Sequence, residues 1–165
     1  AAVAWLYRNI ADYGGDPGRL YLGGHSAGGH YASLLAVRDD WQSALDLPAD
    51  VLRGCLPVSG VYHFGDGSGL SQRPRFLGND DSGSEVEASP IAHISAPTPP
   101  FLMAHGDNDF PHLITQAEEM EEALRRAGTD VKRIVLPGRS HLEAHLATGE
   151  SDGIWKEEVL NFLAA

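Results

Sequence analysis

Residues 20–28 read Leu-Tyr-Leu-Gly-Gly-His-Ser-Ala-Gly, and this stretch determines how the rest of the chain is interpreted. Its apolar start predicts a short strand over residues 20–22. The apolar side chains that follow, spaced among alanines, predict a largely buried helix: Tyr31, Leu34, Leu35 and Val37. Between the two, Gly24-His25-Ser26-Ala27-Gly28 matches GxSxG where a strand turns into a helix. Such a turn holds a serine hydroxyl clear of the sheet, and glycines on either side avoid collisions.

The helix that begins after Ser26 supports a chemical interpretation of this turn. Its first N–H groups and the positive end of its dipole point toward negative charge that forms at the serine. The backbone N–H of Ala27 is therefore a candidate oxyanion donor. The same five residues also fit a glycine-rich turn with an idle serine. A nucleophilic serine further needs a base that removes its proton and an acid that orients the base, in the chain order Ser, Asp, His.

Strands are predicted to alternate with helices along the whole chain. Further strands are expected at residues 52–58, 101–104 and 131–136. Helices are expected before Gly14, over residues 113–124 with an end at Gly128, and over residues 154–163. Parallel neighbours need crossover connections, so this order predicts an α/β fold of about four parallel strands flanked by helices. Residues 60–100 are expected to be mostly loop, with short helices, and to act either as a functional segment or as irregular surface.

Polar segments follow the third and fourth predicted strands, where parallel sheets of this kind bind ligands. His-Gly-Asp-Asn-Asp-Phe-Pro occupies residues 105–111 and offers Asp107 and Asp109 as the acid. Pro-Gly-Arg-Ser-His occupies residues 137–141 and offers His141 as the base, with His145 as an alternative four residues later. The sequence therefore contains every residue type of a Ser-His-Asp triad, in the expected order.

Composition excludes several other classes of function. The 165 residues include 12 lysines and arginines against 23 aspartates and glutamates, a formal net charge of −11 that disfavours nucleic acid and anionic lipid. No apolar run approaches the ~20 residues that cross a bilayer, and no signal-peptide pattern opens the chain. The single cysteine, Cys55, is interpreted as a core residue. The histidines show no metal-ligand spacing, so neither a metal nor a cofactor is expected.

Taken together, five segments resemble the α/β-hydrolase superfamily, close to its bacterial esterase and arylformamidase-like members. They are GGDPGRLYLGGHSAGGH, SGVYHF, ASPI, HGDNDFP and GRSHLEAH, at residues 14–30, 59–64, 88–91, 105–111 and 138–145. The resemblance implies a Ser26–His141–Asp109 triad, because the family acid stands last in HGxxD and the family base follows the last strand. His25, Tyr62 and His63 are candidates for substrate binding. Packing beside the elbow is the alternative for His25, and a surface loop is the alternative for Tyr62 and His63.

The resemblance also implies what precedes the elbow in such proteins. The family carries early strands and a glycine-rich oxyanion segment upstream, which this sequence does not contain. Residues 1–165 are therefore expected to be one partial domain, the C-terminal half of the fold, and to be weak or inactive and aggregation-prone alone. The compartment is open, with the cytoplasm favoured, and so is the oligomeric state.

The implied function is cleavage of a small carboxylic ester through an acyl-enzyme intermediate. Arylformamidase-type hydrolysis of an N-formyl aromatic amine is the alternative within chemistry. The SGVYHF and ASPI runs at residues 59–64 and 88–91 make it plausible, and the triad cannot decide because it serves both reactions. A catalytically silent binding domain or an inactive fragment is the alternative outside it. The expected partner is a small-molecule ester or formamide, with no nucleic acid and no membrane.

Overall fold

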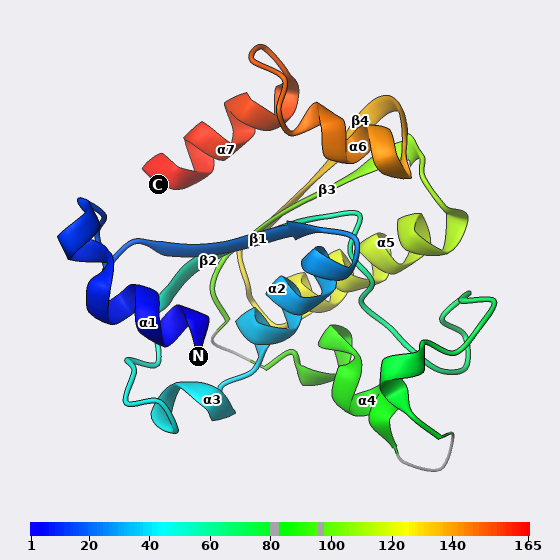
Figure 1. The fold of residues 1–165 in the computed structure, drawn as a ribbon. Coiled ribbons are helices and arrows are strands. Elements are labelled where there is room, and N and C mark those ends of the chain that lie inside the picture. The colour runs from blue at the N-terminus through cyan, green and yellow to red at the C-terminus, as the bar shows by residue number, and fades with distance from the viewer. Residues whose placement is uncertain (80–82, 96–97) are drawn as a thin grey trace.

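Four parallel strands form the sheet of the computed structural model, which describes residues 1–79, 83–95 and 98–165. They are β1 (Leu20–His25), β2 (Leu52–Val58), β3 (Phe101–Asn108) and β4 (Val131–Ser140). Their order is β1-β2-β3-β4, and each strand pairs in parallel with the next (Figure 1). The predicted α/β fold, with about four parallel strands flanked by helices, is therefore confirmed.

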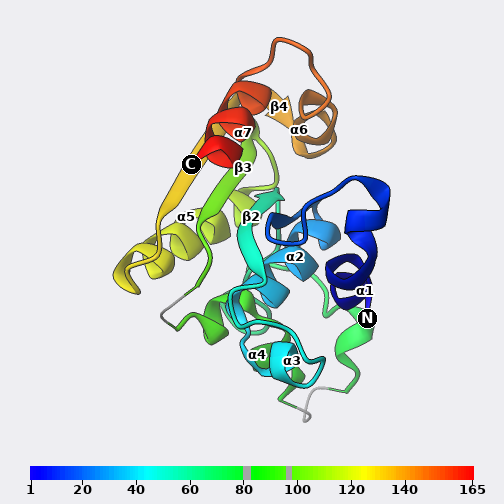
Figure 2. The same cartoon turned by 90° about the vertical axis from the view of Figure 1, so that its left-hand side faces the viewer.

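Helices cover both faces of this sheet (Figure 2). One face carries α1 (Ala2–Asn9), α2 (Ala27–Val37) and α5 (Pro111–Arg126), and the other carries α6 (His141–Ala147) and α7 (Ile154–Ala164). Short elements complete the described chain: η1 (Ile10–Tyr13), α3 (Asp40–Ser43), η2 (Arg75–Leu77), α4 (Ser84–Ala88) and η3 (Pro90–His93). The sheet is thus the middle layer of three.

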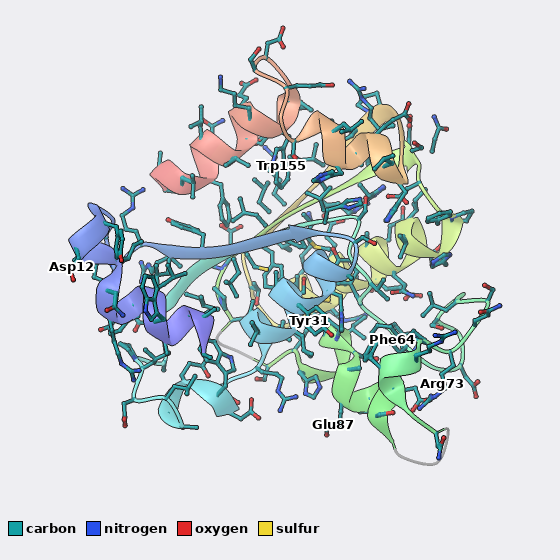
Figure 3. The ribbon with its side chains drawn as sticks, in the orientation of Figure 1. Asp12, Tyr31, Phe64, Arg73, Glu87 and Trp155 are labelled. Carbon is teal, nitrogen blue, oxygen red and sulfur yellow. The ribbon has the colours of Figure 1, made fainter. Side chains whose placement is uncertain are left out.

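Strand β3 shows why the central strands read as continuous apolar runs. Phe101 and Met103 belong to the core on the α2 and α5 side, whereas Leu102 and Ala104 belong to the core on the α6 and α7 side. Both faces of a covered parallel strand must be apolar, so its sequence does not alternate. Trp155 of α7, only 8% exposed, closes the second core against the sheet (Figure 3).

Two sequence expectations need correction. The strands run further than their apolar residues, through His25, Asn108 and Ser140, because strand pairing continues into the polar residues at the carboxyl edge. Helix α2 buries only some of its large side chains: Val37 is 3% exposed, as predicted, but Tyr31 is 55% and Leu35 is 36% exposed. The rest of its buried face consists of His30 and of small residues, which let the helix lie close to the sheet: Gly29, Ala32, Ser33 and Ala36.

The segment between β2 and β3 is mostly irregular, as expected, with three short helical elements among its described residues. Residues 80–82 and 96–97 lie outside the described residues. Buried Gln116 holds this segment to α5, since its Oε1 accepts from the backbone N–H of Tyr62 and of His63, at 2.8 and 2.9 Å. Phe64 and Arg73 lie in this segment, beside α4 (Figure 3). None of the described helices is long and apolar enough to cross a bilayer.

Candidate active site

Ser26 lies on a strained turn between β1 and α2. Its φ of 56° falls in the left-handed region, which costs a residue other than glycine about 1–3 kcal/mol. The turn is fixed by the backbone N–H of Ser26, which donates to the Val58 carbonyl at 2.9 Å. Ala27 is the first residue of α2, the position from which an oxyanion donor was predicted.

The two glycines of the predicted motif have different roles. A Cβ on Gly24 would lie 2.5 Å from the carbonyl carbon of Gly28, so a side chain cannot fit there. A Cβ on Gly28 would meet no atom of the described residues within 4 Å, so the expected collision at that glycine is wrong. The second crowded position is Gly29, whose Cβ would lie 3.0 Å from the Cα of Gly60.

The His141 ring lies between Ser26 and Asp109, within hydrogen-bonding distance of each. The Ser26 hydroxyl lies 2.9 Å from His141 Nε2, and His141 Nδ1 lies 2.9 Å from Asp109 Oδ1. Because a carboxylate only accepts, Nδ1–H donates to Asp109 and leaves Nε2 to accept the serine proton. The His141 side chain is 22% exposed, and the Asp109 side chain is fully buried. The alternative acid and base, Asp107 and His145, are both exposed, and neither takes part in these two hydrogen bonds.

The carboxyl ends of β3 and β4 bring the acid and the base together. Asp109 follows β3 directly, and His141 is the first residue of α6, directly after β4. The start of α6 is fixed by a capping box in which Ser140 and Glu143 bond each other's backbone and side chain. A Cβ on Gly106 would lie 1.8 Å from the Arg139 carbonyl oxygen, so only glycine lets the two strand ends approach this closely.

Ser59 is a site residue that the sequence analysis named only within a motif. Its hydroxyl donates to Asp109 Oδ2 at 2.5 Å, while the Phe110 N–H and His141 Nδ1–H both donate to Oδ1. Ser59 is 2% exposed and has a φ of 50°. The sequence could have indicated Ser59 only by its position directly after the predicted strand at residues 52–58. Its positive φ is not evident from the sequence.

The three residues expected at the substrate lie in different surroundings. His25 is partly buried, and its ring lies against those of His141 and His145, with centroids 4.5 and 5.0 Å away. Tyr62 is 1% exposed within the core, so its side chain neither lines an open pocket nor sits in a surface loop. His63 lines a cavity of about 650 Å³ together with Asp66, Arg73 and Glu85.

Other histidines and the cysteine lie outside this site and make contacts that support the fold. His30 bonds the Ala88 carbonyl, and the His105 ring bonds the Gly106 carbonyl and Arg133. Cys55 is fully buried, as expected, and this burial raises the pKa of its thiol. In the part of the chain that the structure describes, His, Cys, Asp and Glu form no group that could hold a metal ion.

Comparison with known proteins identifies the family of this chain and its esterase relatives. Residues 2–165 match the prolyl oligopeptidase family. The chain is 32% identical to Esterase LipQ of Mycobacterium tuberculosis (strain ATCC 25618 / H37Rv), over 98% of this chain and 41% of that protein. It is 28% identical to a probable isoprenylcysteine alpha-carbonyl methylesterase, ICMEL1, of Arabidopsis thaliana, over 93% of this chain and 36% of that protein.

Solved structures agree on the fold. A truncated carbohydrate esterase from gut microbiota superposes with a TM-score of 0.76 at 18% identity, over 99% of this chain and 65% of that chain. Esterase Est2 of Thermogutta terrifontis gives 0.70 at 22% identity, over 99% and 59%. The resemblance to α/β-hydrolase esterases is confirmed, while its arylformamidase part stays a prediction. The chain spans about two fifths of the length of the curated relative LipQ.

Proposed function

Because the chain belongs to the prolyl oligopeptidase family, we propose that it supplies the nucleophile, base and acid of a serine hydrolase that cleaves small carboxylic esters. The observation that supports this most strongly is the path of hydrogen bonds from Ser26 through His141 to buried Asp109, at 2.9 Å for each step. Three elements far apart in the sequence meet there, which an idle glycine-rich turn does not require. The same path argues against a catalytically silent domain.

The proposed reaction has two steps. Ser26 Oγ attacks the acyl carbon while His141 Nε2 takes the hydroxyl proton, and His141 then gives that proton to the departing alkoxide. Water next attacks the acyl-serine; His141 takes a proton from this water and returns it to Ser26 Oγ as the acid product leaves. Asp109 keeps its charge throughout and orients the ring through Nδ1–H. The Ala27 N–H stabilises the oxyanion in both steps.

The names of the relatives favour an ester substrate over a formamide, because they include Esterase LipQ and a probable carboxylic ester hydrolase, LipM, of the same bacterium. The two runs that suggested an arylformamidase have structural contacts here. Ser59 of the first bonds Asp109, and Ser89 Oγ of the second accepts from the Phe64 N–H at 2.9 Å. These runs therefore carry no separate argument for a formamide.

The test compares turnover of aryl acetates and of N-formylkynurenine by the complete protein. Ser26→Ala should lower ester turnover by about 10⁴-fold or more, since removal of the nucleophile removes the covalent route. Ser43→Ala is the matched control, because Ser43 is exposed on α3, away from the triad. Equal ester turnover by Ser26→Ala and Ser43→Ala would disprove the proposal. Faster turnover of N-formylkynurenine than of the acetates would replace the ester with the formamide.

A further inference from the structure

His25, directly before the nucleophile, makes a contact with His141 that is not one of the hydrogen bonds of the triad. Its Nε2 lies 2.9 Å from the carbonyl oxygen of His141. Since a carbonyl only accepts, the ring must carry its proton on Nε2 and donate it. Neighbouring residues 25 and 26 therefore hold His141 at two places, the backbone through His25 and the imidazole through Ser26.

We infer that His25 is a positioning residue for the proposed base, and that its bond to the His141 carbonyl sets the distance between Ser26 and His141. This inference rests on the proposed function. It replaces the expected role of His25 in substrate binding, because the Nε2–H is already used within the protein.

The order of the strands explains why such a contact is needed. Ser26 follows β1 and His141 follows β4, and β2 and β3 lie between these two strands. Pairing within the sheet therefore leaves the end of β1 and the start of α6 without a direct bond. The His25 contact supplies one, 116 residues apart in sequence. A displacement of about 1 Å between nucleophile and base can cost on the order of 100-fold in rate, so the contact bears on turnover.

The surroundings of His25 keep its ring a neutral donor. Burial lowers the pKa of His25; its bond to the His141 carbonyl raises it, the neighbouring His141 and His145 of α6 lower it, and Asp109 beyond β3 raises it. Burial prevails, so the ring is neutral near pH 7. A neutral ring holds the His141 backbone without placing a second cation beside the imidazolium that forms on His141 during the reaction.

Three variants of the complete protein separate the donor from the ring. His25→Phe keeps an aromatic ring but removes the donor, and should lower kcat by about 10- to 100-fold with KM changed less than about twofold. His25→Gln keeps an N–H donor on a flexible chain and should recover most of this loss. His145→Phe is the control, since the exposed His145 ring lies against the His25 ring but makes no hydrogen bond to the His141 carbonyl, and the backbone bond of α6 is unchanged by this substitution. Its kcat should stay within about twofold of wild type. Wild-type kcat in His25→Phe, or an equal loss in His25→Gln, would overturn the inference.

A second measurement does not depend on activity. Long-range ¹H–¹⁵N NMR correlations at pH 7 report which ring nitrogen of His25 carries the proton, and the Nε2–H form is expected. An Nδ1–H form would overturn the inference even in an active enzyme. A wild-type protein that hydrolyses no ester but shows Nε2–H at His25 would instead refute the proposed function and leave the contact in place.

Discussion

Two substitutions that remove the Ser59 hydroxyl should have different effects on the free energy of unfolding but the same effect on kcat. Ser59 donates to Oδ2 of Asp109, whose side chain is fully buried. Ser59→Ala leaves that charged oxygen without its donor inside the protein. Ser59→Gly removes the same hydroxyl and also relieves the strain of a φ of 50°.

The expected magnitudes follow from these contacts. A hydrogen bond to a charged group contributes about 1.5–3 kcal/mol, so Ser59→Ala should lower the free energy of unfolding by about that amount. The strained backbone costs about 1–3 kcal/mol, so Ser59→Gly should recover at least about 1 kcal/mol of it. Both variants free the Asp109 carboxylate to rotate away from His141 Nδ1. Both should therefore lose about tenfold or more in kcat, with KM little changed.

Urea unfolding and steady-state ester hydrolysis of each variant provide the assay. Asp46→Gly is the control for relief of strain alone, because Asp46 has a φ of 52° on an exposed turn away from the triad. It should match or exceed wild-type stability and keep wild-type kcat. The reasoning is refuted if Ser59→Gly recovers kcat together with stability, or if Ser59→Ala turns over as fast as wild type.

Three further outcomes test the fold around the site. Gly24→Ala should destabilise the protein by about 1–3 kcal/mol through its collision with Gly28, whereas Gly28→Ala should stabilise α2 by about 0.5–1 kcal/mol; equal thermal shifts would contradict the geometry. Burial lowers the pKa of His30 from 6.5, so the unfolded chain binds more protons than the folded one below that pH. The free energy of unfolding should therefore fall on acidification from about pH 6.5, by up to about 1.4 kcal/mol per pH unit for this residue. His30→Gln should remove this contribution to the pH dependence. Urea unfolding of His30→Gln that shows the same pH dependence as wild type from pH 5 to 8 would contradict the prediction. Cys55 should resist iodoacetamide at pH 8 in the folded protein and react in urea, and rapid alkylation of the folded protein would show that the thiol is not buried.

The sequence predicted the fold well where local pattern and topology agree. The apolar run over residues 52–58 matches β2 residue for residue, because a strand covered on both faces has no alternation to obscure it. The helix expected over residues 113–124 lies within α5, which ends at Arg126, two residues before Gly128 with its φ of 80°. The exposure of Tyr31 was not predicted, because the buried face of α2 is set by how closely its glycine and alanines approach the sheet, a property of the packed structure.

For the site, the sequence supplied the residues but not their spatial relations. Ser26, Asp109 and His141 each follow a predicted strand, and the shared carboxyl edge of a parallel sheet accounts for their meeting. The contacts of Ser59 with Asp109 and of His25 with the His141 carbonyl join residues 50 and 116 positions apart. No local pattern encodes such pairs, so these supporting residues emerge only from the structure.

The most direct test of the account is covalent labelling of the complete protein with a fluorophosphonate, with the modified peptide located by mass spectrometry. The reagent reacts with a serine only where a base removes its proton. We expect an adduct on Ser26 alone, which is lost in Ser26→Ala. Labelling should be slowed at least about tenfold in Asp109→Asn, whose side chain no longer orients His141 correctly. An unlabelled folded protein, or an adduct on any other serine, would contradict this expectation.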